Sequence, residues 1–259
     1  MSYFFPALQA EWLKVRKSKV IRITAVVFTI APLMAGFFMI VLINPEFANS
    51  SGLLRAKTQF AGEADWASYL RLHAQIIAVG GILVFGFVTS WIFGREYADR
   101  TAKDLLALPY SRGVIVIAKF IVSFITNILL SAYVVTLGII IGWIIGLPQW
   151  SSAIFVHGLS ILLVVTFITI SLSTPVAFIA SYGGGYLAPL GFVILTVVLS
   201  QIVAVTGFGD YFPWAIPAIF SGLTEGDGVL SFNSLFIIII TSLLGIFSTL
   251  FWWIFADQH

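Results

Sequence analysis

Residues 94–119 read Gly-Arg-Glu-Tyr-Ala-Asp-Arg-Thr-Ala-Lys-Asp-Leu-Leu-Ala-Leu-Pro-Tyr-Ser-Arg-Gly-Val-Ile-Val-Ile-Ala-Lys. This stretch holds 8 of the chain's 24 Asp, Glu, Lys and Arg residues. The runs on either side of it are apolar and long enough to cross a bilayer. The stretch therefore predicts a charged, water-exposed loop between two membrane spans.

Local signals within this stretch indicate a short helix. Thr101-x-x-Asp104 resembles a capping box that starts a helix, with Asp in place of the usual Glu or Gln. Three leucines then supply an apolar face before Pro109, and Ser111 can cap the next helix. A plain loop that only orients the spans is the alternative, but Lys and Arg suffice for that role. Three acids and a capped helix favour a docking surface.

The composition is that of a membrane protein. Of the 259 residues, 60% are hydrophobic and 9% are charged, whereas soluble proteins are about one quarter charged. The mean hydropathy is +1.06. The chain has no cysteine, which excludes disulfides and thiol chemistry, and its three histidines are scattered, so no metal site is expected.

Hydropathy predicts an all-α polytopic membrane protein, a single transmembrane domain over residues 1–259 with six spans. Pro32 and Pro175 should kink the first and the fourth span, which is tolerated where neighbouring helices satisfy the freed carbonyls. The spans are expected at residues 20–43, 75–94, 114–146, 153–180, 187–206 and 234–255.

Three segments outside the spans have distinct patterns. Residues 3–18 place apolar residues at helical spacing beside a basic face, which indicates a helix lying in the membrane interface. A basic tail that only orients the first span is the alternative. Residues 95–112 form the charged loop, and residues 207–233, without Lys or Arg, indicate short helices resting in or dipping into the outer leaflet.

The basic residues predict the orientation of the spans. Ten of the 13 lie before or at the start of the first span, between the second and third spans, or at the start of the third span. By the positive-inside rule, both termini and the charged loop should be cytoplasmic. The ten are Lys14, Arg16, Lys17, Lys19, Arg22, Arg95, Arg100, Lys103, Arg112 and Lys119, and the other three are Arg55, Lys57 and Arg71.

Two further features concern the spans themselves. Gly138, Gly142 and Gly146 recur every fourth residue and predict a helix-packing seam, although chance in a glycine-rich chain is the alternative. The partner helix could belong to this chain or to another subunit. His157 and Gln201 could line a path through the membrane, or could serve as hydrogen-bonded packing residues.

Several motifs are missing from the sequence. It has no Gly-x-x-x-x-Gly-Lys-Ser/Thr phosphate loop, no His-Glu-x-x-His zinc pair and no Gly-x-Ser-x-Gly nucleophile elbow. The centres of the expected spans carry no charged residue, so a proton- or sodium-coupled carrier would lack its usual groups. Any transport should therefore be powered from outside the membrane.

The charged loop resembles that of a known family. Phe93-Gly-Arg-Glu-Tyr-x-x-x-Thr-x-Lys-x-Leu-Leu-x-Leu-Pro-x-Ser-Arg112, with Lys119 beyond it, is similar to the first cytoplasmic loop of type-2 ABC exporter permeases of bacteria. The likeness includes bacitracin-resistance and lantibiotic-immunity permeases. Asp99-Arg100 stands where those loops often have a glycine before the threonine.

The resemblance implies an ATP-driven exporter in the bacterial cytoplasmic membrane, with this chain as its non-enzymatic permease subunit. ATP and Mg would bind a separate ATPase, and a second permease, the same or a related chain, would complete the transporter. No cofactor in this chain and no nucleic-acid partner is expected. The loop would be the coupling helix, with ATPase docking assigned to Arg95, Glu96, Tyr97, Asp99, Arg100, Thr101, Lys103, Asp104 and Arg112.

The cargo implied by the resemblance is amphipathic or hydrophobic, with antimicrobial-peptide export, antibiotic resistance or bacteriocin immunity as the leading role. Export of drugs, ions or glycolipids stays open. The competing readings are a secondary carrier or a non-catalytic membrane assembly protein without an ATPase. A membrane enzyme acting on lipids or peptides would need clustered polar catalytic residues at one membrane face, and the sequence indicates none.

Overall fold

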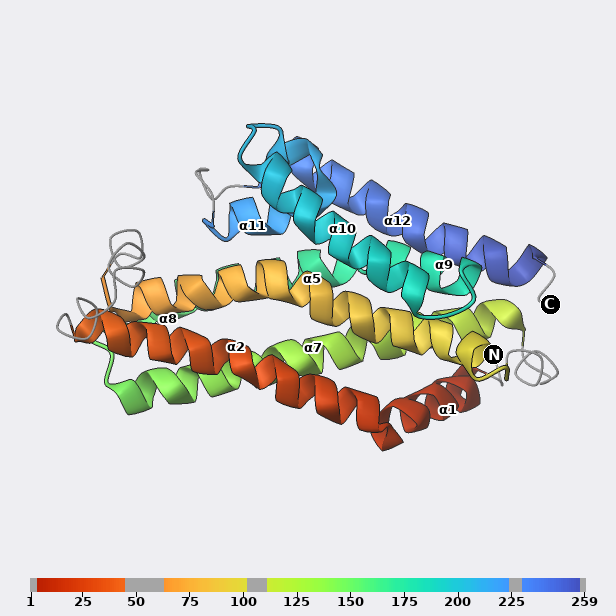
Figure 1. Cartoon of the computed structure of the whole chain (residues 1–259), viewed down its shortest axis with the longest axis horizontal. Helices are drawn as coiled ribbons and strands as arrows, with labels where there is room; N and C mark the ends of the chain where they lie inside the picture. Colours follow the sequence, from red (N-terminus) through yellow and green to blue (C-terminus); the bar gives the residue numbers. More distant parts are fainter. Residues whose placement is uncertain (1–3, 45–62, 102–110, 224–229, 257–259) are drawn as a thin grey trace.

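The computed structural model describes residues 4–44, 63–101, 111–223 and 230–256. Within these ranges the chain forms helices and no strand, and the long helices run side by side along one axis (Figure 1). The elements are α1 (Phe4–Lys17), α2 (Lys19–Ile43), α5 (Trp66–Ala98), α7 (Arg112–Ile145), α8 (Ser152–Ser171), α9 (Thr174–Tyr182), α10 (Leu187–Ala204), the 3₁₀ turns η1 (Gly209–Tyr211) and η2 (Pro213–Ala215), α11 (Ile216–Phe220) and α12 (Phe232–Phe255).

In the part of the chain that the structure describes, six helical stretches are long and apolar enough to cross a membrane, which confirms the predicted all-α, six-span architecture. They are α2, α5, α7, the α8–α9 pair, α10 and α12. Side-chain oxygens cap the first backbone N–H groups of most of these helices, which fixes where they begin. The capping residues are Ser18, Asp65, Ser111, Ser151 and Ser231.

Helix α5 begins earlier than the predicted start at residue 75. Asp65 accepts a hydrogen bond from the backbone N–H of Ser68 at 2.8 Å, and the helix runs without a break from Trp66 to Ala98. Its first turns contain Arg71 and His73, whose polarity conceals the helix in a hydropathy profile. At 33 residues, α5 is longer than a bilayer crossing requires.

The fourth span is interrupted where the sequence places Pro175. Helix α8 ends at Ser171 and α9 begins at Thr174. Because proline has no N–H, the carbonyl of Ser171 loses its usual donor four residues later, and the hydroxyl of Thr174 donates to it instead at 2.9 Å. Pro32, by contrast, lies inside the continuous helix α2.

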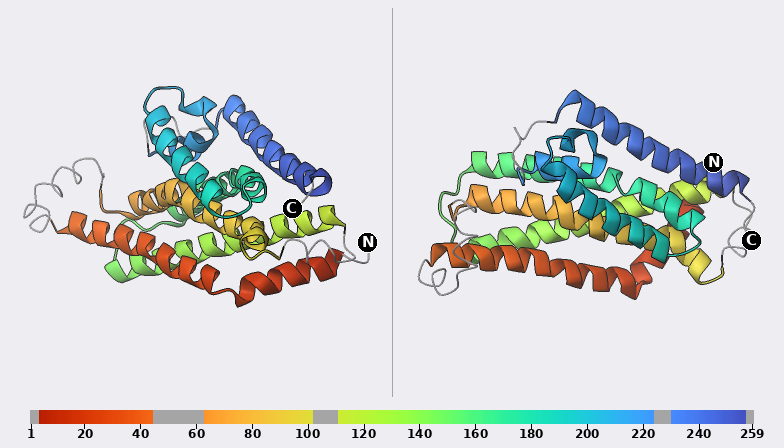
Figure 2. Two further views of the ribbon diagram at one scale, coloured as in Figure 1. Left: turned by 45° about the vertical axis from the view of Figure 1, so that its right-hand side comes forward. Right: turned by 45° about the horizontal axis from the view of Figure 1, so that its top comes forward.

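Helix α5 lies in the middle of the bundle and packs against α2, α7, α8, α9 and α10 (Figures 1 and 2). Helix α12 packs mainly against α9 at one side of the bundle. The two ends of the chain lie at the same end of the bundle, as an even number of crossings requires. Between α10 and α12, the short elements η1, η2 and α11 lie toward the opposite end, where short helices were predicted.

Two of the three seam glycines bring α7 against α5 of the same chain. A methyl group at Gly138 would overlap the imidazole of His73, and one at Gly142 would come within 2.7 Å of Trp66. The hydroxyl of Tyr69 also donates to the carbonyl of Gly138 at 3.0 Å. Gly146 has a different role, because it ends α7 in the left-handed conformation, with φ at 74°. The seam is therefore intramolecular at two positions.

We expect Gly138→Ala to lower the free energy of unfolding by about 1–3 kcal/mol, because the added methyl group must displace a buried ring. Gly191→Ala is the matched control, since no atom lies within 4 Å of the Cβ that it adds. Thermal unfolding of both variants in detergent, followed by tryptophan fluorescence, measures the difference. Equal melting temperatures would show that α5 and α7 do not approach as closely as the structure indicates.

Candidate functional site

Five charged side chains from three helices meet where α1, the end of α5 and the start of α7 come together. Figure 1 shows these helix segments at the end of the bundle that carries both chain ends. Ser18 separates α1 from α2, so the chain changes direction there and α1 packs against α7. Side chains of α1 also contact the last turns of α5. We call the five residues the ion cluster: Glu11 and Lys14 of α1, Arg95 and Glu96 of α5, and Lys119 of α7.

Lys119 is the centre of the ion cluster. Its Nζ lies 2.8 Å from Glu96 Oε1 and 3.1 Å from Glu11 Oε2, and it donates a third hydrogen bond to the carbonyl of Ile92 at 2.9 Å. These contacts use all three donors of the ammonium group. The side chain is 0% exposed. Lys119 therefore ties α7 to α1 and to α5 at the same point.

The other two cations complete the ion cluster. Arg95 contacts Glu11 Oε2 through Nη2 and Glu96 Oε1 through Nε, both at 3.1 Å, and its guanidinium lies 4.9 Å from the ring centre of Trp91. Lys14 lies at the open edge, 2.6 Å from Glu11 Oε1 and 3.2 Å from Glu96 Oε1, with 36% of its side chain exposed. Three cations thus face two carboxylates.

The charges of the ion cluster depend on one another. Burial raises the pKa of Glu11, but Lys119 and then Lys14 outweigh this effect and hold the pKa below its ordinary value of 4.5. The carboxylate of Glu11 therefore stabilises the fold above pH 4.5, and this contribution is lost as the pH falls through the lowered pKa. Glu96 Oε2 is buried and has no hydrogen-bond partner among the described residues.

Residues 7–202 match the family model described as an ABC-2 family transporter protein. The chain belongs to the ABC-2 transporter family. It is also 28% identical over 187 residues to the bacitracin transport permease protein of Bacillus licheniformis, across 71% of this chain and 88% of that protein. No solved structure matches the chain. The protein is therefore a multi-pass permease subunit of an ABC transporter, as the resemblance of the charged loop predicted.

The structure separates the residues predicted for ATPase docking in this ABC-2 permease. Arg95 and Glu96 are buried in the ion cluster, so their side chains face neighbouring helices rather than solvent. Asp99, Arg100 and Thr101 are exposed at the end of α5. Tyr97 is half-buried, Arg112 donates to backbone carbonyls at the end of α12, and Lys103 and Asp104 lie outside the described residues.

The exposed end of α5 has a defined backbone geometry. The N–H of Thr101 donates to the carbonyl of Glu96 at 2.8 Å, and the N–H of Arg100 donates to that of Tyr97 at 3.2 Å. This is a Schellman motif, in which the residue after the cap adopts the left-handed conformation. Arg100 is that residue, with φ at 59°. Glycine would carry no Cβ penalty in that conformation, so Arg100 is held there against a small backbone cost.

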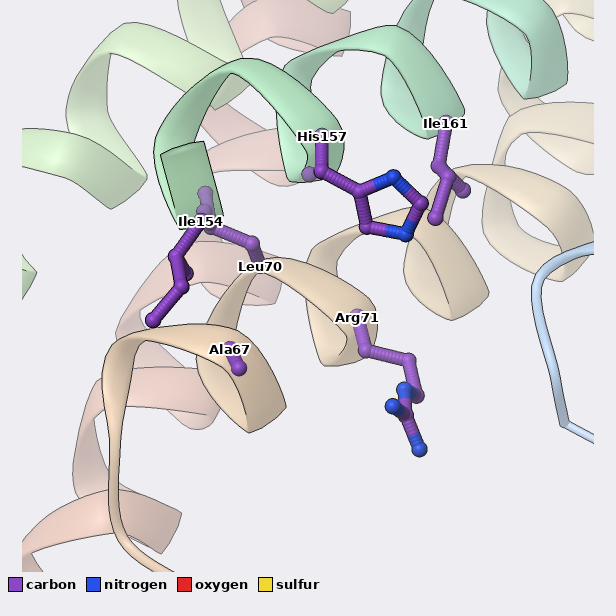
Figure 3. Close-up of a pocket in the computed structure, with 7 residues that line it drawn as sticks. Ala67, Leu70, Arg71, Ile154, His157 and Ile161 are labelled. Carbon is purple, nitrogen blue, oxygen red and sulfur yellow. The ribbon is translucent and has the colours of Figure 1, made fainter. Parts of the chain in front are cut away.

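The two predicted path residues lie on the outside of the permease. Gln201 is exposed on α10. His157 of α8 is also exposed and lines a shallow pocket of about 90 Å³, where its ring lies on the same side as the guanidinium of Arg71 from α5 (Figure 3). Sites for drug-sized ligands are larger, roughly 300–1,000 Å³. The structure does not bring His157 and Gln201 together in the interior.

Sequence reasoning noted Lys119 only as the lysine beyond the motif of the charged loop, and it did not identify Glu11 and Lys14 as its partners or the polar interior of α7. Glu11 and Lys14 were assigned only to the polar side of an interfacial helix. The signal that could have found them is an acid and a base three residues apart in the helix before a span. Asn127 is 0% exposed in α7, and neither atom of its amide has a partner among the described residues.

Proposed function

We propose that this permease moves an amphipathic or hydrophobic molecule out of a bacterial cell, driven by a cytoplasmic ATPase subunit that docks against residues 95–112. The membership in the ABC-2 family supports the ATPase-driven mechanism, and the relative described as a bacitracin transport permease supports an antimicrobial peptide as cargo. The positive-inside rule supports a cytoplasmic position for both chain ends and this loop. A second permease, identical or related, would complete the transporter.

One observation carries this proposal: the exposed end of α5 follows directly on the buried ion cluster. Asp99, Arg100 and Thr101 lie within five residues of Glu96, which is bound to cations on α1, α5 and α7. A force applied to the loop therefore acts at once on three helices, because the buried charges cannot separate without leaving one of them unpaired. In this proposal Asp99 and Arg100 contact the ATPase, and Arg95 and Glu96 transmit its movement.

A pull-down in mild detergent tests the proposal. The tagged chain should bring an ATPase with it, and the complex should hydrolyse ATP with sensitivity to vanadate. Asp99→Lys combined with Asp104→Lys should lower the recovered ATPase by tenfold or more, since unfavourable charge contacts at an interface cost several kcal/mol and each 1.4 kcal/mol is about tenfold.

Asp210→Lys is the control, because Asp210 is exposed in η1, a segment that lies toward the opposite end of the bundle. It should leave the recovery of the ATPase unchanged. Isolation of the chain without an ATPase, together with ion-driven transport by the chain alone in liposomes, would replace the proposal with a secondary carrier.

A further inference from the structure

A cavity of about 330 Å³ lies among α5, α7, α8, α9 and α12. Its volume is within the range of sites that bind small molecules. Phe124 of α7, which lines it, is 40% exposed, so the cavity reaches the surface of the bundle. Thr89 lines it from α5, seven residues before Glu96, which places it about 10 Å along the helix from the ion cluster. It is separate from the shallow pocket of Figure 3.

The lining combines apolar surface with hydroxyl groups. Isoleucines and two phenylalanines, Phe120 and Phe124, supply most of the apolar surface, and none of the residues that line the cavity is charged. An ion would lose its hydration there without gaining a counter-charge, which is costly in a membrane interior. The hydroxyl groups belong to Thr89, Ser123, Ser171, Ser173, Thr174 and Ser242.

The hydroxyl groups have unused hydrogen-bonding capacity. Thr89 donates to Ser173 Oγ at 3.2 Å, and Ser173 donates to the carbonyl of Ile170 at 2.7 Å. Because Thr89 has one proton, Ser123, whose Oγ lies 2.9 Å away, must donate to it. Ser123 thus keeps free acceptor positions. Ser242 Oγ is buried without a partner among the described residues, so it keeps a free donor.

The interruption between α8 and α9 explains why hydroxyl groups gather here. Ser171, Ser173 and Thr174 come from this break and line the cavity. The hydroxyl of Thr174 lies within reach of two carbonyls, those of Ser171 at 2.9 Å and Ser242 at 3.0 Å. Non-helical backbone at membrane depth is tolerated where protein covers it or where it lines a cavity. Broken helices border the binding sites of many transporters.

We propose that this cavity binds a neutral amphipathic molecule, with its apolar part against Phe120 and Phe124 and a hydroxyl or amide group on Ser123 and Ser242. A hydroxyl or amide both donates and accepts, which matches the acceptor left on Ser123 and the donor left on Ser242. If this molecule is the one that the permease transports, the inference rests on the proposed function. Lys119 precedes Phe120, so a movement of the ion cluster would reshape the cavity.

Photolabelling of the full chain in lipid nanodiscs tests this site without an ATPase, so its failure is distinguishable from failure of the exporter proposal. The probe is a monoacylglycerol with a diazirine in its acyl chain. Two analogues carry the same diazirine-bearing acyl chain: in one, a methyl ester replaces the glycerol ester, and in the other, a trimethylammonium group replaces the glycerol head. We expect the monoacylglycerol to label peptides with Phe120, Phe124 or Ile246, which line the cavity, at least fivefold more than either analogue.

Ser242→Ala and Ser242→Leu are the informative variants, because the hydroxyl that they remove has no partner among the described residues and the fold should tolerate its loss. Ser242→Ala should reduce labelling severalfold, and Ser242→Leu, which fills the cavity, should abolish it. Ser160→Leu on the exposed face of α8 is the control and should label as the wild type does. Even labelling over lipid-facing peptides, or unchanged labelling of Ser242→Leu, would overturn the proposal.

Discussion

Glu96→Gln should lower the free energy of unfolding of this permease by about 3–5 kcal/mol, the cost of removing one partner from a buried ion pair. Glu96 lies within 3.2 Å of all three cations of the ion cluster. Without its charge, Glu11 alone would face Lys14, Arg95 and Lys119. Glutamine has nearly the same volume as glutamate, so the loss measures charge rather than packing.

Two further variants distinguish the effect of an unbalanced charge from the effect of lost contacts on the free energy of unfolding. Lys119→Met leaves two cations and two carboxylates, so it should destabilise less than Glu96→Gln, although it removes the most buried cation. The double variant leaves Glu11 with Lys14 and Arg95, which restores the surplus of one positive charge. Its destabilisation should therefore be smaller than the sum of the two single effects.

Asp99→Asn is the control for the same helix end, because Asp99 is exposed. Its effect should stay within about 0.5 kcal/mol. Thermal unfolding in detergent, read by tryptophan fluorescence, gives all four values. A melting temperature for Glu96→Gln equal to that of Asp99→Asn would contradict the paired, buried state of Glu96. Glu96→Lys would not test ATPase docking, because it would place four cations around the single carboxylate of Glu11 and so destabilise the fold itself.

The membrane architecture was predictable because bilayer crossing requires long apolar runs, and such runs are local in sequence. The cap at Ser111 was also predictable, because it depends on a single hydroxyl, and so was the interruption near Pro175, because it depends on a missing N–H. A helix around residues 61–72 and a span from residue 75 were predicted as separate elements, because Arg71 and His73 lower the local hydropathy between them; the structure joins them in α5, and the ring of His73 packs against α7.

The ion cluster was not predictable from local pattern. Arg95 and Glu96 lie in a charged stretch, and charge in a loop ordinarily indicates exposure to water or to a partner. Their burial depends on α1 turning back at Ser18 to bring Glu11 and Lys14 to them, a contact over more than 80 residues of sequence. Among the described residues, those predicted to dock the ATPase that are exposed are Asp99, Arg100 and Thr101.

Asn127→Leu should raise the stability of this permease and slow its transport. Asn127 is buried in α7, and both polar atoms of its amide lack partners among the described residues. A buried polar group without a partner costs about 1–3 kcal/mol, and leucine, whose side chain has the same number and branching of heavy atoms but no polar group, removes that cost. The free energy of unfolding should therefore rise by about this amount, and the melting temperature should rise with it.

Ser131→Ala, one turn further along α7, is the contrasting control. Ser131 Oγ lies 2.9 Å from Thr166 Oγ1, so this substitution leaves the hydroxyl of Thr166 without that partner. It should lower stability by about 1 kcal/mol. The two neighbouring substitutions should therefore change stability in opposite directions, and the direction depends only on whether the native side chain has a hydrogen-bond partner.

The effect of Asn127→Leu on transport follows from the free-energy cost of the unpaired amide. A transporter alternates between conformations, and an unpaired amide in one of them favours any other conformation in which the amide finds a partner. Removing a penalty of 1–3 kcal/mol shifts that equilibrium by about 5- to 150-fold toward the conformation described here. Transport by the reconstituted complex should fall accordingly, while binding of the proposed ATPase is unchanged. A variant that is less stable, or equally stable and fully active, would show that Asn127 is already satisfied in this conformation.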